Sequence, residues 1–192
     1  MIFFAPVMFV LFWVMMIAQE FLVPWTVATN FGVAEVYFFL PWIFFYSMAL
    51  AIPYPLMVAF AALTGFAWDA RWQVPGDSLD LPFGSSIVLF VIFGSVVQGI
   101  RPLFRRGNWF FPVIMVGLAV FFQLAAQYLL LSFRRGSFEF SSELWFTVVF
   151  TSVASMALSP VLFWLNSRIA RRCGYELEIE QFTFRRSYGH QI

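Results

Sequence analysis

A long stretch without charge, from Val36 to Trp68, limits the folds open to this chain more than any other feature. One hydrocarbon span needs about 20 apolar residues, so this stretch is too long for one helix and predicts two. The segment Ile52–Pro53–Tyr54–Pro55 holds two prolines, which remove backbone donors and oppose helical geometry. We therefore place the turn between the two helices there. The second helix reaches Asp69, four residues after Gly65, and this acidic end is the most distinctive polar feature of the chain.

The composition indicates a membrane protein. Over 192 residues the chain is 62% hydrophobic and 11% charged, whereas soluble domains carry about 25% charged residues. We therefore predict an all-α fold, a polytopic membrane helix bundle over residues 1–168. A cytoplasmic tail, first basic and then acidic, follows over residues 169–192. The formal net charge of +1 gives no indication of nucleic-acid binding, so membrane lipid is the expected surrounding and nucleic acid is not an expected partner.

The uncharged stretches divide the chain into about six transmembrane helices. Their expected ranges are Ile2–Gln19, Ala34–Ala51, Pro55–Trp72, Pro82–Ile100, Trp109–Phe133 and Leu144–Ser167. The stretch Glu20–Val33 leaves the choice between five and six spans open, because it suits an interfacial or re-entrant segment as well as a connection.

Arginines indicate the orientation, since every basic residue of the chain is arginine. With six spans, three arginines fall on the side opposite the termini: Arg71, Arg134 and Arg135. The other eight fall on the side of the termini: Arg101, Arg105, Arg106, Arg168, Arg171, Arg172, Arg185 and Arg186. Because cytoplasmic segments are enriched in basic residues, both termini are predicted to be cytoplasmic.

Asp69 has three possible roles. A carboxylate within a membrane costs about 2.5–3.5 kcal/mol on insertion scales, so it normally has a partner or a function. It would cap a loop in the headgroup zone, couple transport to a proton or ion, or lock two helices or subunits together. The capping role is favoured over ion coupling, and the polar lock remains open.

Four amide side chains are candidates for interhelical polar contacts. Gln123 and Gln127 lie four residues apart on the fifth span and therefore share a face. Gln98 on the fourth span and Asn166 on the sixth could meet that face. Such amides would line a pocket in a transporter, but hydrogen bonds between helices are the favoured interpretation.

Catalytic and metal-binding motifs are not evident in the sequence. The chain has one histidine, His190, and one cysteine, Cys173. The spacings typical of zinc hydrolases, phosphate-binding loops and serine hydrolases do not occur. We therefore expect no enzymatic activity, no metal site and no cofactor.

Three segments together resemble the MreD family of bacterial rod-shape-determining proteins. They are Leu63–Thr64–Gly65–Phe66–Ala67–Trp68–Asp69, Pro82–Phe83–Gly84–Ser85–Ser86 and Arg101–Pro102–Leu103–Phe104–Arg105–Arg106. The family has a Gly-x-x-x-Asp helix end, then a span that begins with a glycine and finishes in a basic cytoplasmic loop. The resemblance covers residues 5–173, and the loop between Asp69 and Gly84 is longer and more acidic than is typical of the family.

The resemblance implies a non-enzymatic scaffold of the cell-elongation machinery in the bacterial inner membrane. It implies a packing or partner-binding role for Gly65, Asp69, Gly84, Arg101, Arg105 and Arg106. The implied partners are MreC, MreB, RodA and a class B penicillin-binding protein.

The MreD fold is similar to that of the substrate-binding components of energy-coupling-factor transporters. The alternative is therefore a small-molecule-binding membrane subunit of a vitamin-type transporter. Such components usually carry Ala-x-x-x-Ala pairs on an early helix, whereas Phe3–Ala18 is rich in Phe, Trp, Met and Val. This difference favours the scaffold. A proton-coupled carrier that uses Asp69 is the weakest alternative.

Overall fold

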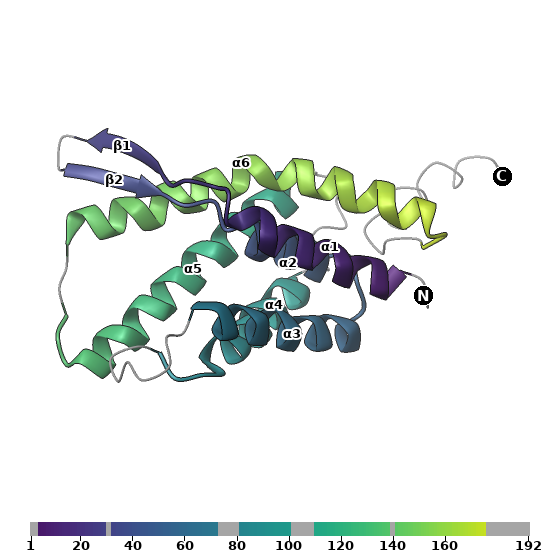
Figure 1. Cartoon of the computed structure of the whole chain (residues 1–192), viewed down its shortest axis with the longest axis horizontal. Coiled ribbons are helices and arrows are strands. Elements are labelled where there is room, and N and C mark those ends of the chain that lie inside the picture. Colours follow the sequence, from purple (N-terminus) through teal and green to yellow (C-terminus); the bar gives the residue numbers. More distant parts are fainter. Residues whose placement is uncertain (1–3, 30–31, 73–80, 101–109, 139–140, 176–192) are drawn as a thin grey trace.

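The computed structural model describes residues 4–29, 32–72, 81–100, 110–138 and 141–175. These residues form six helices and one two-stranded sheet (Figure 1). The elements are α1 (Phe4–Gln19), β1 (Trp25–Thr29), β2 (Gly32–Val36), α2 (Leu40–Ala49), α3 (Tyr54–Trp72), α4 (Ser85–Ile100), α5 (Phe110–Arg135) and α6 (Ser142–Arg172). The predicted tail from residue 176 onward lies outside the described residues.

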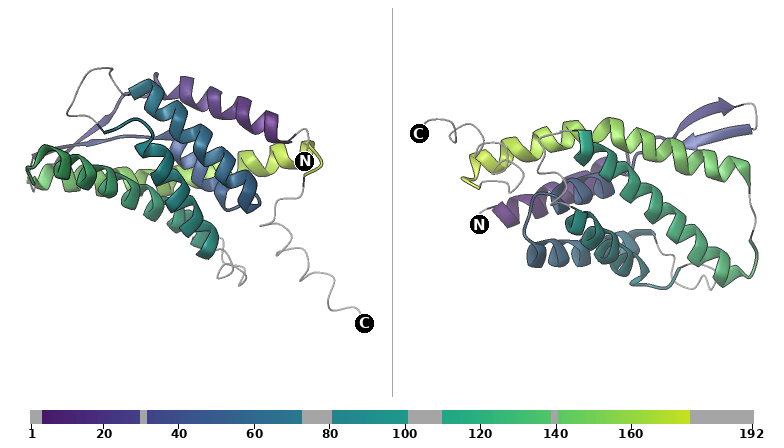
Figure 2. Two further views of the ribbon diagram at one scale, coloured as in Figure 1. Left: turned by 90° about the horizontal axis from the view of Figure 1, so that it is seen from below. Right: turned by 180° about the vertical axis from the view of Figure 1, so that it is seen from behind.

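Consecutive helices run in opposite directions between two ends of the bundle (Figures 1 and 2). At one end Phe4 of α1 stacks on Tyr175, just after α6, with ring centroids 4.3 Å apart. At the other end Glu20, after α1, forms an ion pair with Arg71 of α3. The chain therefore reverses its direction from each helix to the next.

Helix α2 is the centre of the bundle, and all its residues after Leu40 are buried. Pro41 lies in its first turn, where the missing amide proton is not needed, and the Pro53 turn separates it from α3. The predicted turn between these two helices is therefore confirmed. Ten residues give α2 a length of about 15 Å, half the thickness of a hydrocarbon core.

The prediction of a helix beginning at Ala34 is wrong, because residues 34–36 belong to β2. Strands β1 and β2 pair antiparallel from Trp25↔Val36 to Thr29↔Gly32, so the fold is not purely α. β-branched residues favour strands, and the hairpin holds five: Thr26, Val27, Thr29, Val33 and Val36. The stretch that left five or six spans open is thus largely a hairpin that projects beside the first half of α6 (Figure 1).

Side chains of α1 and α6 accept hydrogen bonds from backbone amides between β2 and the first residue of α2. Thr147 Oγ1 accepts from the Glu35 amide at 3.3 Å, and Thr151 Oγ1 accepts from the Tyr37 amide at 3.1 Å. The Tyr37 hydroxyl donates to the Glu35 carboxylate, and this hydrogen bond raises the pKa of Tyr37 above its ordinary value. Gln19 Oε1 accepts from the Leu40 amide at 2.9 Å and so caps α2.

Helix α6 continues through Pro160 and ends at Arg172, five residues after the predicted end at Ser167. Proline has no amide proton to donate to the carbonyl four residues earlier, which belongs to Met156. The Ser159 hydroxyl donates to that carbonyl at 3.0 Å. A neighbouring serine thus replaces the missing donor, which is one way that buried apolar helices tolerate proline.

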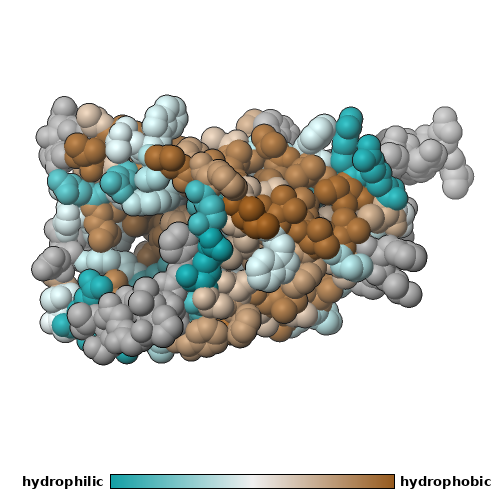
Figure 3. Space-filling model, in the orientation of Figure 1, coloured by the Kyte–Doolittle hydropathy of each residue, from teal (hydrophilic) through white to brown (hydrophobic). Residues whose placement is uncertain are grey.

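Apolar side chains cover much of the outer surface (Figure 3). In α1 the residues Phe4, Met8, Phe12 and Met16 are buried on one face. The opposite face exposes Val10, Val14 and Ile17, each at least half exposed. A helix that is apolar on all sides yet half exposed suits a hydrocarbon surrounding better than water. Among the described residues, α5 and α6 are long and apolar enough to cross a membrane.

Candidate functional site

Helices α3 and α4 are in close backbone contact at Gly65. A β-carbon on Gly65 would lie 2.5 Å from the backbone nitrogen of Ile87 and 2.9 Å from the backbone carbonyl carbon of Ser86. Both atoms belong to the backbone of α4, which no rotamer change can move aside. The contact at this point therefore requires glycine.

Asp69 lies one turn further along α3 and caps the start of α4. Its Oδ2 accepts from the Gly84 amide at 2.7 Å and from the Ser86 amide at 3.3 Å. The first amides of a helix have no partner within the helix, and its positive N-terminus favours an anion. Asp69 is only 2% exposed, so these donors compensate the burial of its carboxylate.

Gly84 completes the contact through its backbone conformation. It has a φ of +93°, in the region that side chains disfavour, although a β-carbon there would meet no atom within 4 Å. This conformation immediately precedes α4, and the Gly84 amide donates to Asp69. We call Gly65, Asp69 and Gly84 together the α3–α4 lock.

The chemistry of the lock is structural. Oδ2 of Asp69 is committed to two backbone amides, so this carboxylate holds two helices together. The described part of the chain contains no group of three or more His, Cys, Asp or Glu side chains that could hold a metal ion. Arg101, Arg105 and Arg106 lie outside the described residues.

Gln98 caps the C-terminal end of α2. Its Nε2 donates to the carbonyl of Ala49 at 2.9 Å and to that of Ile52 at 2.7 Å. The last carbonyls of a helix have no partner within it, and α2 ends inside protein. A side chain of α4 therefore supplies the donors that water would supply on a soluble surface.

Replacing Gln98 by leucine is expected to lower the free energy of unfolding by about 1–3 kcal/mol, because two buried carbonyls lose their donor. Gln127→Leu is the matched control, since Gln127 is also half-buried. Unfolding titrations in mixed detergent micelles measure both. Equal losses in the two variants would contradict the capping role.

Gln123 and Asn166 also contact α2, at separate points. The buried Tyr46 hydroxyl donates to Gln123 Oε1, and Asn166 Nδ2 donates to Ser47 Oγ at 2.9 Å. The hydrogen bonds of Gln98, Gln123 and Asn166 thus run to α2 or to the turn after it, whereas the sequence suggested that Gln98 and Asn166 could meet the face of Gln123 and Gln127. Each of the three joins its own helix to α2.

The Tyr46–Gln123 pair predicts a non-additive double-mutant cycle. Tyr46→Phe and Gln123→Leu each leave a buried polar group unpaired, so each is expected to lower the unfolding free energy by about 1–3 kcal/mol. The double variant is expected to lose less than the sum, since replacing both partners removes the unpaired group. The exposed Tyr54→Phe is the control. Additive losses would show that the hydrogen bond contributes nothing.

The threonine pair that binds the end of the hairpin and the residue after it was not predicted from the sequence. Thr147 and Thr151 are four residues apart on α6, which places both hydroxyls on one face. That spacing is a usable signal, but only once a strand is expected beside the helix.

Comparison of the chain with known protein families, with curated proteins and with solved structures finds no match.

Proposed function

We propose that this chain is an integral inner-membrane protein with six crossings and both termini in the cytoplasm. Three features support the proposal: alternating helix directions, an apolar outer surface, and two helices long enough to span. The end of the bundle that holds Arg168, Arg171 and Arg172 is then cytoplasmic. Helix α2 is too short to span by itself, but its neighbours bury it from lipid.

Reporter fusions test this topology. A reporter after Ile192 is expected to be active only in its cytoplasmic form, and one inserted at Gly76 only in its external form. The reason is the excess of arginine at the end that holds the termini. Two reporters active on the same side would contradict an even number of crossings.

We further propose that the protein is a non-enzymatic scaffold of the cell-elongation machinery. The supporting observation is the α3–α4 lock: three of the residues that carry the resemblance to the MreD family, Gly65, Asp69 and Gly84, form a contact with a structural role. A rigid pair of helices suits a protein that presents a fixed surface to other membrane proteins. MreC, MreB, RodA and a class B penicillin-binding protein remain the proposed partners.

The two alternative functions gain less support from the described residues. A vitamin-binding subunit needs a pocket with a few polar groups that orient the ligand. The described pocket, between α1 and α3, is lined by apolar side chains. A carrier that couples to protons through Asp69 would need a carboxylate free to exchange them, and this one caps α4.

Depletion of the protein in its own cells tests the scaffold function. Rod-shaped cells are expected to become round and to regain their shape when the wild-type chain is supplied. His190→Ala with Cys173→Ala should restore shape equally well, because a scaffold needs no nucleophile or base. Cells that keep their rod shape during depletion would contradict the proposed function.

A further inference from the structure

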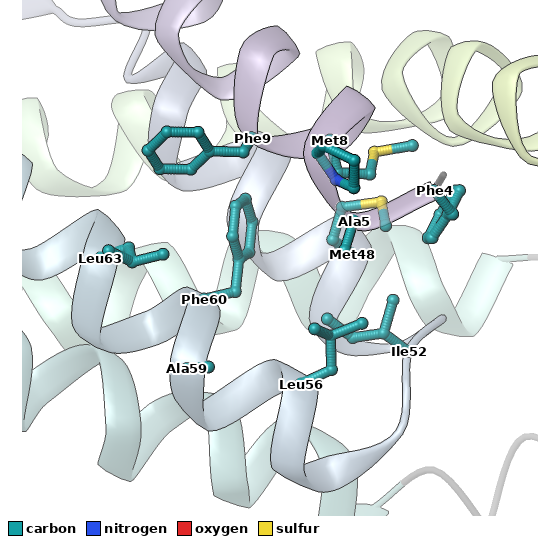
Figure 4. Close-up of a pocket in the computed structure, with 11 residues that line it drawn as sticks. Phe4, Ala5, Met8, Phe9, Met48, Ile52, Leu56, Ala59, Phe60 and Leu63 are labelled. Carbon is teal, nitrogen blue, oxygen red and sulfur yellow. The ribbon is translucent and has the colours of Figure 1, made fainter. Parts of the chain in front are cut away.

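An apolar groove runs between α1 and α3, with α2 as its floor (Figure 4). Its volume is about 280 Å³. Met48 and Ile52 form the floor, while Ala5 on α1 and Ala59 on α3 lie on opposite walls. Phe9 and Leu63 at the rim are exposed, so the groove opens on the outer surface of the bundle.

The lining suits a flexible hydrocarbon chain better than a partner helix. Helices associate in membranes through rows of small residues and through polar side chains that bond across the contact. The groove offers no polar side chain, and bulky Phe9, Leu56 and Phe60 interrupt its small residues. From Leu56 to Leu63 it follows α3 for about 10 Å, which suits part of an acyl chain.

One end of the groove contacts the segment just after α6, whose last turn carries two arginines. Phe4, which lines the groove, stacks on Tyr175. Tyr175 is held to the end of α6 by its amide, which donates to the Ala170 carbonyl at 2.9 Å. The exposed Arg171 and Arg172 lie in that last turn. The turn that carries these two arginines is thus connected through Tyr175 to the end of the groove that Phe4 lines, and basic residues near a membrane surface attract anionic lipid.

We infer that this groove binds an anionic phospholipid, with an acyl chain between α1 and α3 and the phosphate beside Arg171 and Arg172. The inference goes beyond the scaffold function and rests only on the proposed membrane location. The two arginines would then bind the negatively charged phosphate, and the groove would bind the extended acyl chain. A zwitterionic lipid fills the same groove but gains less from the arginines.

Native mass spectrometry of the full chain tests the inference, after release from nanodiscs with equal phosphatidylglycerol and phosphatidylcholine. The wild type is expected to retain phosphatidylglycerol over phosphatidylcholine by about tenfold. Arg171→Gln with Arg172→Gln should remove this preference, whereas Arg134→Gln with Arg135→Gln, at the other end, should keep it. Ala59→Trp should reduce retention of both lipids, whereas Val96→Trp, on an exposed face of α4, should not.

Three results with the variants would overturn the inference. One is equal lipid retention in Ala59→Trp and Val96→Trp, and another is a preference for phosphatidylglycerol that survives loss of Arg171 and Arg172. The third is a dimer that Ala59→Trp dissociates, because a second copy would then occupy the groove. A protein that stays in the membrane after an alkaline wash yet retains no phosphatidylglycerol contradicts only this inference. Release by the wash contradicts the membrane location as well.

Discussion

Gly65→Leu is expected to lower the free energy of unfolding by about 3 kcal/mol or more, the upper end of the range for overpacked cores. The reason is that the added side chain meets the backbone of α4 at Ser86 and Ile87. Gly65→Ala should have the same direction and a smaller effect, because one methyl group still lies within 3 Å of that backbone. Unfolding titrations of the purified protein in mixed micelles measure both losses.

Gly99→Ala is the matched control, since Gly99 lies on an exposed part of α4 and a β-carbon there meets nothing within 4 Å. Alanine is a better helix former than glycine by about 1 kcal/mol, so this variant should be as stable as the wild type or more stable. A loss of stability on substituting Gly65, with no loss on substituting Gly99, would identify the close contact between α3 and α4 as the cause. Equal stability of Gly65→Leu and the wild type would contradict the lock.

Asp69→Ala is expected to lower the free energy of unfolding by about 1–3 kcal/mol, because the half-buried Gly84 amide and the buried Ser86 amide lose their acceptor. Asp69→Asn should lose less, because its amide oxygen still accepts from the same donors. The same micelle titrations measure both variants. The exposed Glu143→Ala is the control and should change stability by about 0.5 kcal/mol at most.

The asparagine variant also separates a cap from a proton carrier. An amide accepts hydrogen bonds but does not carry a proton at neutral pH, so Asp69→Asn is expected to restore rod shape in depleted cells. Loss of function in a stable Asp69→Asn protein would favour the proton-coupled alternative. Equal stability of Asp69→Ala and the wild type would show that the cap is unimportant.

The face of α3 that carries Gly65 and Asp69 could be predicted from the sequence because its geometry is local to one helix. Spacing by four placed Gly65 and Asp69 on one face, and the Pro53 turn set the start of their helix. The partner of that face was less accessible. Which amides an aspartate caps depends on the loop before α4, and the sequence left internal and intermolecular locks equally open.

The hairpin and the contacts of α2 could not be predicted from residue spacing and hydropathy. Val36 begins the uncharged stretch that hydropathy assigns to a helix, and only Glu35 and the β-branched residues around it oppose a helix start at Ala34. For the amides the sequence suggested mutual contact, but Gln98 bonds to backbone carbonyls. Carbonyls at a helix end have no residue-specific signature, so such partners appear only when the helices are placed in space.

Capture of the tagged chain from membranes of its own cells tests the scaffold function most directly, with MreC as the protein to be detected. We expect MreC to co-purify with the wild type and with Gly99→Ala. It should be lost or strongly reduced with Gly65→Leu, at equal amounts of chain in the membrane. Failure to detect MreC with a wild-type chain that supports growth and remains in the membrane would contradict the proposed scaffold.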